Sequence, residues 1–136
     1  MARIDRRAIG TGAALGLAVL AFTIVAFGLV DRAAGIGWRS NWVFLFYAVA
    51  FAGLVAGGRL AARRRPEAPL VHGVVAALAA YAVVAVLDIV VGAMVGAAAD
   101  PVGLAFNALM AASAGTLGTL IAERSASRPP RPSATS

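Results

Sequence analysis

Four long apolar runs constrain this chain more than any other feature of its sequence. They cover Ala8–Val30, Trp42–Gly58, Leu70–Ala99 and Val102–Ala122. A helix of about 20 apolar residues crosses the roughly 30 Å of hydrocarbon in a bilayer. None of the runs alternates polar and apolar residues as a barrel strand does. Because lipid-exposed backbone must be hydrogen-bonded within its own segment, the runs predict four transmembrane helices.

The composition argues against a soluble protein. Of the 136 residues, 61% are hydrophobic and only 13% are charged, whereas a soluble domain is about half apolar and a quarter charged. The chain has no cysteine, which excludes disulfides, thiol chemistry and cysteine-ligated metal. The first run is too long for the apolar region of a secretory signal, so we expect an uncleaved membrane helix.

The net charge of +6 comes from arginine, because the chain contains no lysine. In a soluble protein such a charge would suggest a nucleic-acid partner. Here the arginines lie between apolar runs, so we expect them to meet the anionic head groups of a lipid bilayer, and no nucleic acid. Arginine, alanine, glycine and proline have GC-rich codons, and their abundance indicates a bacterial genome of high GC content.

The arginines also predict an orientation. Ten of the twelve lie in the N-terminal segment, the second connection and the tail, whereas only Arg32 and Arg39 lie in the first connection. Positively charged loops stay in the cytoplasm. We therefore expect a multi-pass protein of the plasma (inner) membrane with both termini inside. The basic residues expected to face cytoplasmic lipid head groups are Arg59, Arg63, Arg64 and Arg65.

The expected fold class is all-α, a four-transmembrane-helix bundle of two antiparallel hairpins with cytoplasmic termini. Its helices are expected over about residues 8–30, 42–59, 70–98 and 102–122. They belong to a transmembrane domain of residues 1–124, and residues 125–136 form a polar, proline-rich tail that is expected to be disordered.

Residues in the connections support these boundaries. Asp100 is expected to cap the fourth helix, with Pro101 in its first turn. Ser40 or Asn41 can cap the second helix. The two prolines of the segment RRRPEAP are expected to separate the second helix from the third.

Small residues at helical spacing predict close helix packing. The pairs are Gly12/Gly16, Gly53/Gly57, Gly92/Gly96, Ala111/Gly115 and Ala114/Gly118. One interpretation is packing within a single four-helix bundle. The other is a seam between two copies of the chain, as in a homodimer or a larger membrane complex.

A single carboxylate interrupts the third run, in the stretch AYAVVAVLDIVVGAMVG. The run would be about 45 Å long as a straight helix, more than the bilayer requires. The surplus is expected at its outer end, with a bend at Gly92 or Gly96. Asp88 would then lie in the outer third of the membrane, and the small residues on its face indicate that it points into the bundle.

Each of the other helices carries one polar residue near the level of Asp88. Thr23, Tyr47 and Asn107 lie about 8 to 10 Å from the outer ends of their helices. We therefore expect an intramembrane polar layer of Asp88, Asn107, Thr23 and Tyr47, with Ser113 as an alternative partner. Such a layer either fixes helix register or couples a proton or an ion, and both hypotheses stay open.

The residue types argue against catalysis, which needs a nucleophile with a base or a metal cluster. His72, the only histidine, is expected at the opposite side of the membrane from Asp88. We expect its ring to be hydrogen-bonded to the adjacent turn, with a titrating role as the alternative. The sequence thus predicts no enzyme, no catalytic residue, no metal site and no cofactor.

The segment GGRLAARRRPEAPLVHGVVAALAAY, residues 57–81, resembles a pattern in the YrzE-like four-helix bacterial membrane proteins. The shared features are a glycine pair that ends the second helix, a basic turn, and Leu70, His72 and Gly73 at the start of the third. The turn PEAP departs from that pattern. The resemblance implies a four-helix membrane architecture, and no activity, because that family is uncharacterised.

Two functional hypotheses follow. The first is a non-catalytic accessory or structural component of the membrane. The second is a small proton- or ion-coupled transporter or channel subunit that uses Asp88. The strong arginine asymmetry fixes one orientation and favours the first hypothesis.

Overall fold

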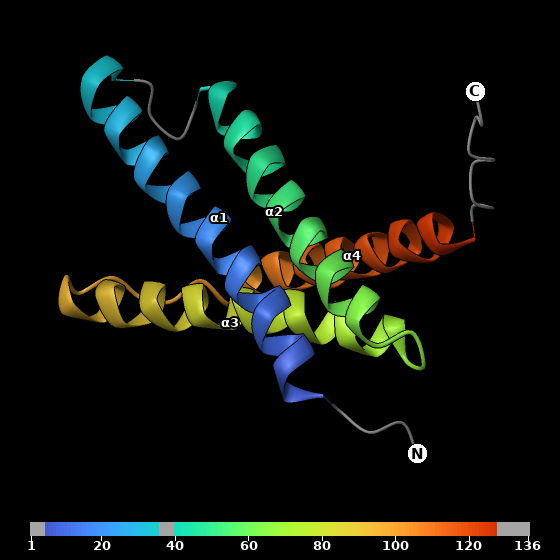
Figure 1. Ribbon diagram of the computed structural model, residues 1–136. Helices are drawn as coiled ribbons and strands as arrows, with labels where there is room; N and C mark the ends of the chain where they lie inside the picture. Colours follow the sequence, from blue (N-terminus) through green and yellow to red (C-terminus); the bar gives the residue numbers. More distant parts are fainter. Residues whose placement is uncertain (1–4, 36–39, 128–136) are drawn as a thin grey trace, which may run out of the picture.

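The computed structural model describes residues 5–35 and 40–127, and these residues form four helices (Figure 1). The helices are α1 (Arg6–Ala34), α2 (Trp42–Arg64), α3 (Pro69–Met94) and α4 (Pro101–Ala126). No strand occurs in these two ranges. All four helices are long and apolar enough to cross a membrane. The expected all-α fold of four membrane-spanning helices is confirmed, and the chain is a multi-pass membrane protein.

The observed helices differ from the expected ones mainly at their ends. α1, α2 and α4 each extend by several residues into the polar connections, so the first two residues of the expected tail are helical. α3 is shorter and ends at Met94, before the expected boundary at residue 98. Gly96 follows with a φ of 74°, a left-handed conformation that suits glycine. The surplus of the third run is therefore a turn rather than a longer helix. The tail from residue 128 lies outside the described residues.

Local capping explains where α2 and α4 begin. The Asp100 side chain accepts a hydrogen bond from the Val102 backbone N–H at 3.0 Å, with Pro101 in the first turn, and this cap is confirmed. At α2, Asn41 occupies the cap position without a side-chain hydrogen bond. The Ser40 hydroxyl instead accepts from the Trp42 N–H at 3.4 Å. The prolines of the α2–α3 turn flank the helix ends as expected.

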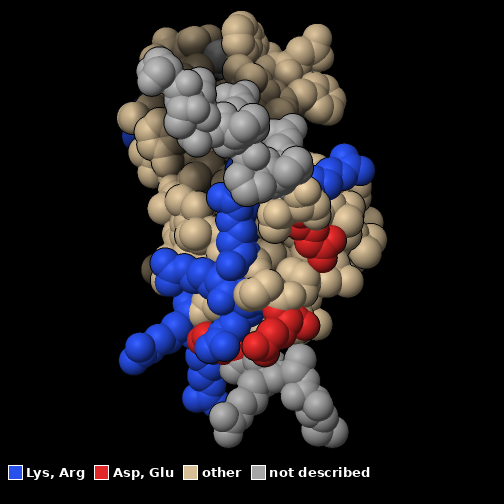
Figure 2. Space-filling view, turned by 45° about the vertical axis from the view of Figure 1, so that its right-hand side comes forward, with Lys and Arg blue, Asp and Glu red and all other residues tan. Residues whose placement is uncertain are grey.

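One end of the molecule, which we call the arginine-rich end, holds the start of α1, the α2–α3 turn and the end of α4. Figure 2 shows basic and acidic side chains gathered on the lower part of one face, around this end. The opposite end, with the α1–α2 and α3–α4 connections, is the arginine-poor end. α1 packs against α2 and α3, and α4 packs against the same two helices, but the described parts of α1 and α4 do not pack against each other.

Backbone contact between glycines holds the helices together toward the arginine-rich end. A Cβ added to Gly57 would lie 2.5 Å from the Gly12 carbonyl oxygen, and a Cβ on Gly12 would lie 2.5 Å from that of Gly57. Gly58, Gly73 and Gly115 converge from α2, α3 and α4 in the same way. These glycines pack within one chain, which is the first of the two interpretations of the small-residue pairs.

The Gly92/Gly96 pair does not take part in this packing. A Cβ on Gly92 would meet only Ala97, and one on Gly96 would meet no atom within 4 Å. Toward the arginine-poor end the two hairpins diverge, with α1 and α2 leaning away from α3 and α4 (Figure 1). The structure is thus packed by small residues at one end and open at the other.

We expect Gly57→Ala to lower the thermal stability of the protein in detergent or nanodiscs, because the new methyl group must push α1 away from α2. Overpacking of this kind costs about 1 to 3 kcal/mol. The matched control is Gly10→Ala on α1, where a Cβ meets no atom within 4 Å, so that helix propensity alone should leave stability equal or higher. Equal melting temperatures for Gly57→Ala and wild type would contradict the close approach.

Candidate functional site

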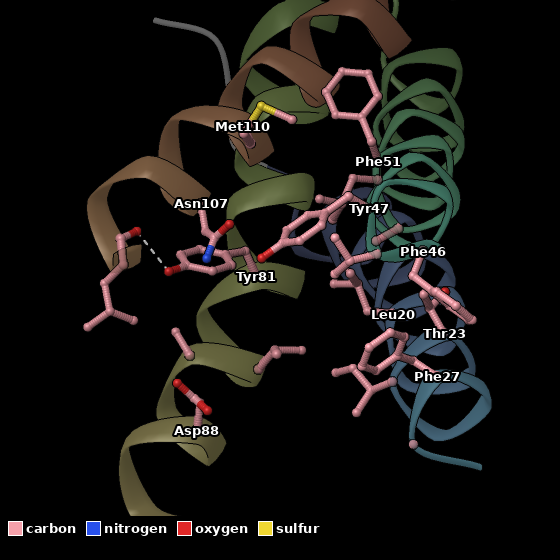
Figure 3. Close-up of a pocket in the computed structure, with 18 of the residues that line it drawn as sticks. Leu20, Thr23, Phe27, Phe46, Tyr47, Phe51, Tyr81, Asp88, Asn107 and Met110 are labelled. Atoms are coloured by element: carbon pink, nitrogen blue, oxygen red, sulfur yellow. Dashed lines mark hydrogen bonds between the residues drawn. The ribbon is translucent and has the colours of Figure 1, made fainter. Parts of the chain in front are cut away.

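The diverging hairpins enclose an open cleft of about 560 Å³ in the arginine-poor half of the molecule (Figure 3). One wall comes from α1 and α2 and the other from α3 and α4. The cleft ends where the glycine packing begins, since Leu20 and Leu54 line it and also belong to the buried core. Its size is within the range of ligand sites, about 300 to 1,000 Å³.

The α1–α2 wall is aromatic. Phe27 of α1 and Phe46 of α2 pack edge to face, with ring centroids 4.7 Å apart and an angle of 79° between the rings. This geometry is favourable for aromatic pairs and keeps the two helices together along the wall. Tyr47 is 46% exposed and points from α2 across the cleft (Figure 3). Phe51 lines the cleft at its deeper end.

The α3–α4 wall carries three polar side chains. Asp88 and Tyr81 come from α3 and Asn107 from α4. The Tyr81 hydroxyl donates a hydrogen bond of 2.8 Å to the Leu104 carbonyl of α4. This bond joins the two helices of the wall, and the carbonyl it reaches lies in the first turn of α4, one turn before Asn107.

All four residues of the expected polar layer line this one cleft: Thr23, Tyr47, Asp88 and Asn107. Their surroundings differ from the expectation, because the layer lies on the walls of an open cleft instead of inside a closed bundle. Asp88 is exposed in the cleft. Thr23 is buried, and its hydroxyl donates to the Val19 carbonyl of its own helix at 2.7 Å.

Two other polar residues, Ser113 and Tyr81, differ from what the sequence predicts for the polar layer. Ser113, the alternative partner, is exposed and donates to the Leu109 carbonyl of its own helix, and it does not line the cleft. Tyr81 was not expected in the layer, although it lies on the same face of α3 as Asp88, two helical turns earlier. The spacing of seven residues between Tyr81 and Asp88, which is about two helical turns, is the sequence signal that could have placed Tyr81 in the layer.

Asp88 is the feature of the cleft that most needs a chemical explanation. It lies six residues before the end of α3, about 9 Å along the axis. An aspartate at the centre of a membrane helix costs roughly 2.5 to 3.5 kcal/mol on insertion, and less nearer the surface. Among the described residues, no arginine lines the cleft and no ion pair to Asp88 is formed. The site therefore offers an accessible carboxylate on an otherwise apolar wall.

His72 belongs to a second polar cluster, at the arginine-rich end. Its side chain is 1% exposed. Nε2 accepts a hydrogen bond from the Asp5 backbone N–H at 3.0 Å, and Nδ1 lies 2.8 Å from the Ala68 carbonyl oxygen. Because Nε2 accepts, the proton of the neutral ring is assigned to Nδ1, which donates to Ala68. The expected bond to the adjacent turn is confirmed, and the ring also holds the start of α1.

Asp5 connects this cluster to the basic turn. Its carboxylate caps α1 by accepting from the Arg7 and Ala8 backbone N–H groups at 2.8 and 3.3 Å. It also accepts from Arg65 Nε at 2.6 Å and forms an ion pair with that guanidinium. The Arg65 hydrogen bond, followed by the Arg7 backbone N–H, lowers the pKa of the Asp5 carboxyl below 3.8.

The four basic residues expected to face lipid head groups have different surroundings. Arg63 and Arg64 are exposed at the end of α2. Arg65 is exposed but paired with Asp5. Arg59 differs from the expectation: it is half-buried beside α4, one terminal nitrogen lies 3.5 Å from the Ser125 hydroxyl, and its Nε is buried without a partner in the described structure. Gly118 of α4 lies against the backbone of α2 at Arg59, so α4 packs closely over this part of α2.

In the described ranges, no three side chains of His, Cys, Asp or Glu gather where they could hold a metal ion. In comparisons with known proteins, no family model, curated protein or solved structure matches the chain. The features of the protein that bear on its function are therefore its class, a four-helix multi-pass membrane protein, and the chemistry of its cleft.

We expect acidification to destabilise the arginine-rich end through Asp5. A carboxyl whose pKa is lowered by folding stabilises the protein above its unfolded value near 3.8, and this contribution is lost as the pH falls through the folded pKa. Asp5→Asn keeps a helix-capping side chain but removes the charge that pairs with Arg65. The variant should be less stable than wild type above about pH 5, and the difference should shrink below pH 3.8.

Melting temperatures measured from pH 7 to pH 3 check this expectation. Glu67→Gln is the matched control, because Glu67 is an exposed carboxylate of the α2–α3 turn. A stability difference between Asp5→Asn and wild type that stays constant over this range would contradict the assigned role of Asp5.

Proposed function

We propose that this protein is a non-catalytic, multi-pass component of a bacterial plasma membrane that acts by binding a ligand in the cleft between its hairpins. In this proposal both termini lie in the cytoplasm, and the cleft opens toward the outer side. The arginine asymmetry supports the orientation. Arg63 and Arg64, exposed at the end of α2, would then meet anionic lipid head groups.

One observation carries the binding role: four polar residues from four different helices line the same apolar cleft. A few polar groups on an apolar, partly enclosed surface are typical of a ligand site. The described lining contains carboxylate, amide and hydroxyl groups, but no histidine, cysteine or lysine that could act as a base or a nucleophile. These groups can hold a ligand by charge and by hydrogen bonds, which supports the binding role.

A second candidate function is transport coupled to Asp88. It is favoured by the accessibility of this carboxylate and by a cleft that is open at one end and closed at the other, as in one state of a carrier. The glycine packing argues against it, because opening the closed end would separate backbones that now touch.

Proton flux separates the two candidates. We expect vesicles that contain the wild-type protein to lose an imposed pH gradient at the rate of protein-free vesicles, because the glycine-packed end blocks a path. The comparison includes Asp88→Asn and, as a control with the same change of charge, Glu67→Gln. A faster decay with wild type and Glu67→Gln that is absent with Asp88→Asn would refute pure binding and favour transport.

Single-cysteine labelling tests the proposed orientation. Because the chain has no native cysteine, only the introduced cysteine can be labelled. In intact spheroplasts, a membrane-impermeant maleimide should label Ala98→Cys, in the exposed α3–α4 connection, but not Glu67→Cys, in the α2–α3 turn. Permeabilisation should expose Glu67→Cys. Labelling of Glu67→Cys alone in intact cells would reverse the orientation.

A further inference from the structure

We propose that the cleft binds an amphipathic organic cation, a molecule with an apolar body and one positively charged group, and that Asp88 supplies the counter-charge. This inference rests on the proposed binding role of the cleft and adds the chemical class of the ligand. It follows from three properties of the cleft: its charge, its aromatic surface and its volume.

Asp88 gives the cleft a negatively charged group, on the α3–α4 wall. No arginine is among the described lining residues, and lysine is absent from the whole chain. A carboxylate between apolar walls attracts a cation more strongly than it would in water, because the low dielectric screens the pair less. An anionic ligand would meet repulsion at the same place.

The aromatic surface faces this charge across the cleft. The opposite wall includes four aromatic side chains: Phe27, Phe46, Tyr47 and Phe51. Tyr81 lies two turns from Asp88 on the same helix. Aromatic rings bury the apolar part of a ligand and also attract a cation to their faces. A ligand between the walls would therefore have aromatic rings on one side and the Asp88 carboxylate on the other.

The volume of the cleft is suitable for a small molecule. The cleft measures about 560 Å³, which suits one ligand of drug size. A lipid acyl chain is small enough, but it is neutral and leaves Asp88 without a counter-charge.

Two probes of nearly equal size and shape test the charge directly. Tetraphenylphosphonium is cationic and tetraphenylborate is anionic, and both have four phenyl groups. Binding is measured to the full chain in nanodiscs of phosphatidylcholine, after subtraction of partition into empty nanodiscs. We expect tetraphenylphosphonium to bind wild type at least about tenfold more tightly than tetraphenylborate does. This comparison needs no variant, so it does not depend on how a variant folds.

Variants then assign the site. Asp88→Asn should weaken tetraphenylphosphonium binding by about tenfold or more, whereas Glu67→Gln, at the opposite end, should leave it unchanged. Tyr47→Leu should weaken binding of both probes, because it removes an aromatic surface without changing charge. Ala85→Cys, which lines the cleft, should be protected from maleimide by tetraphenylphosphonium, and Val86→Cys, on the outer surface of α3, should not.

Tight, Asp88-dependent binding of tetraphenylphosphonium with protection at position 85 supports the proposal. Equal binding of both probes, or binding unchanged in Asp88→Asn, would show an apolar cleft without cation selectivity and would overturn it. No specific binding of tetraphenylphosphonium to the folded wild type would also overturn it. The probe experiment and the proton-flux experiment fail independently. Failure of the probe experiment overturns the ligand class but does not change the flux result. A faster proton flux would refute the non-transport function but would not change the probe comparison.

Discussion

Contact between glycine backbones is the constraint on which the rest of this structure depends. Gly12 and Gly57 bring α1 onto α2, and Gly58, Gly73 and Gly115 bring α2, α3 and α4 together toward the arginine-rich end. Apolar side chains give little net attraction between helices in lipid, so close packing and polar contacts have to hold a bundle together. Here the packing is concentrated at one end, and the helices are free to separate at the other.

The cleft is the consequence of this asymmetry. Because the hairpins diverge beyond the glycine contacts, polar side chains that would meet in a closed bundle line an open cavity instead. The Tyr81 bond to Leu104 and the Phe27–Phe46 pair stiffen the two walls separately. The cleft is therefore a space between two internally bonded hairpins, which gives Asp88 a fixed place and an accessible carboxylate.

Much of the candidate site could be predicted from the sequence, because depth in a membrane follows from position along a helix. Thr23, Tyr47, Asp88 and Asn107 share a level by this count, and all of them line the cleft. The open shape could not be predicted in this way, since it depends on how two hairpins meet. For the same reason Arg59 was expected on the lipid side, although α4 packs over it and leaves its Nε buried.

The sequence by itself determined the number of helices, their membrane class and several of their ends. Hydropathy and capping act within a few residues of each segment, as Asp100 shows at the start of α4. Tertiary structure decided which small-residue pairs are used, that Gly92/Gly96 is not among them, and that Asp5 reaches His72 and Arg65. These outcomes join residues that are distant in sequence, and only the packing of whole helices brings such residues into contact.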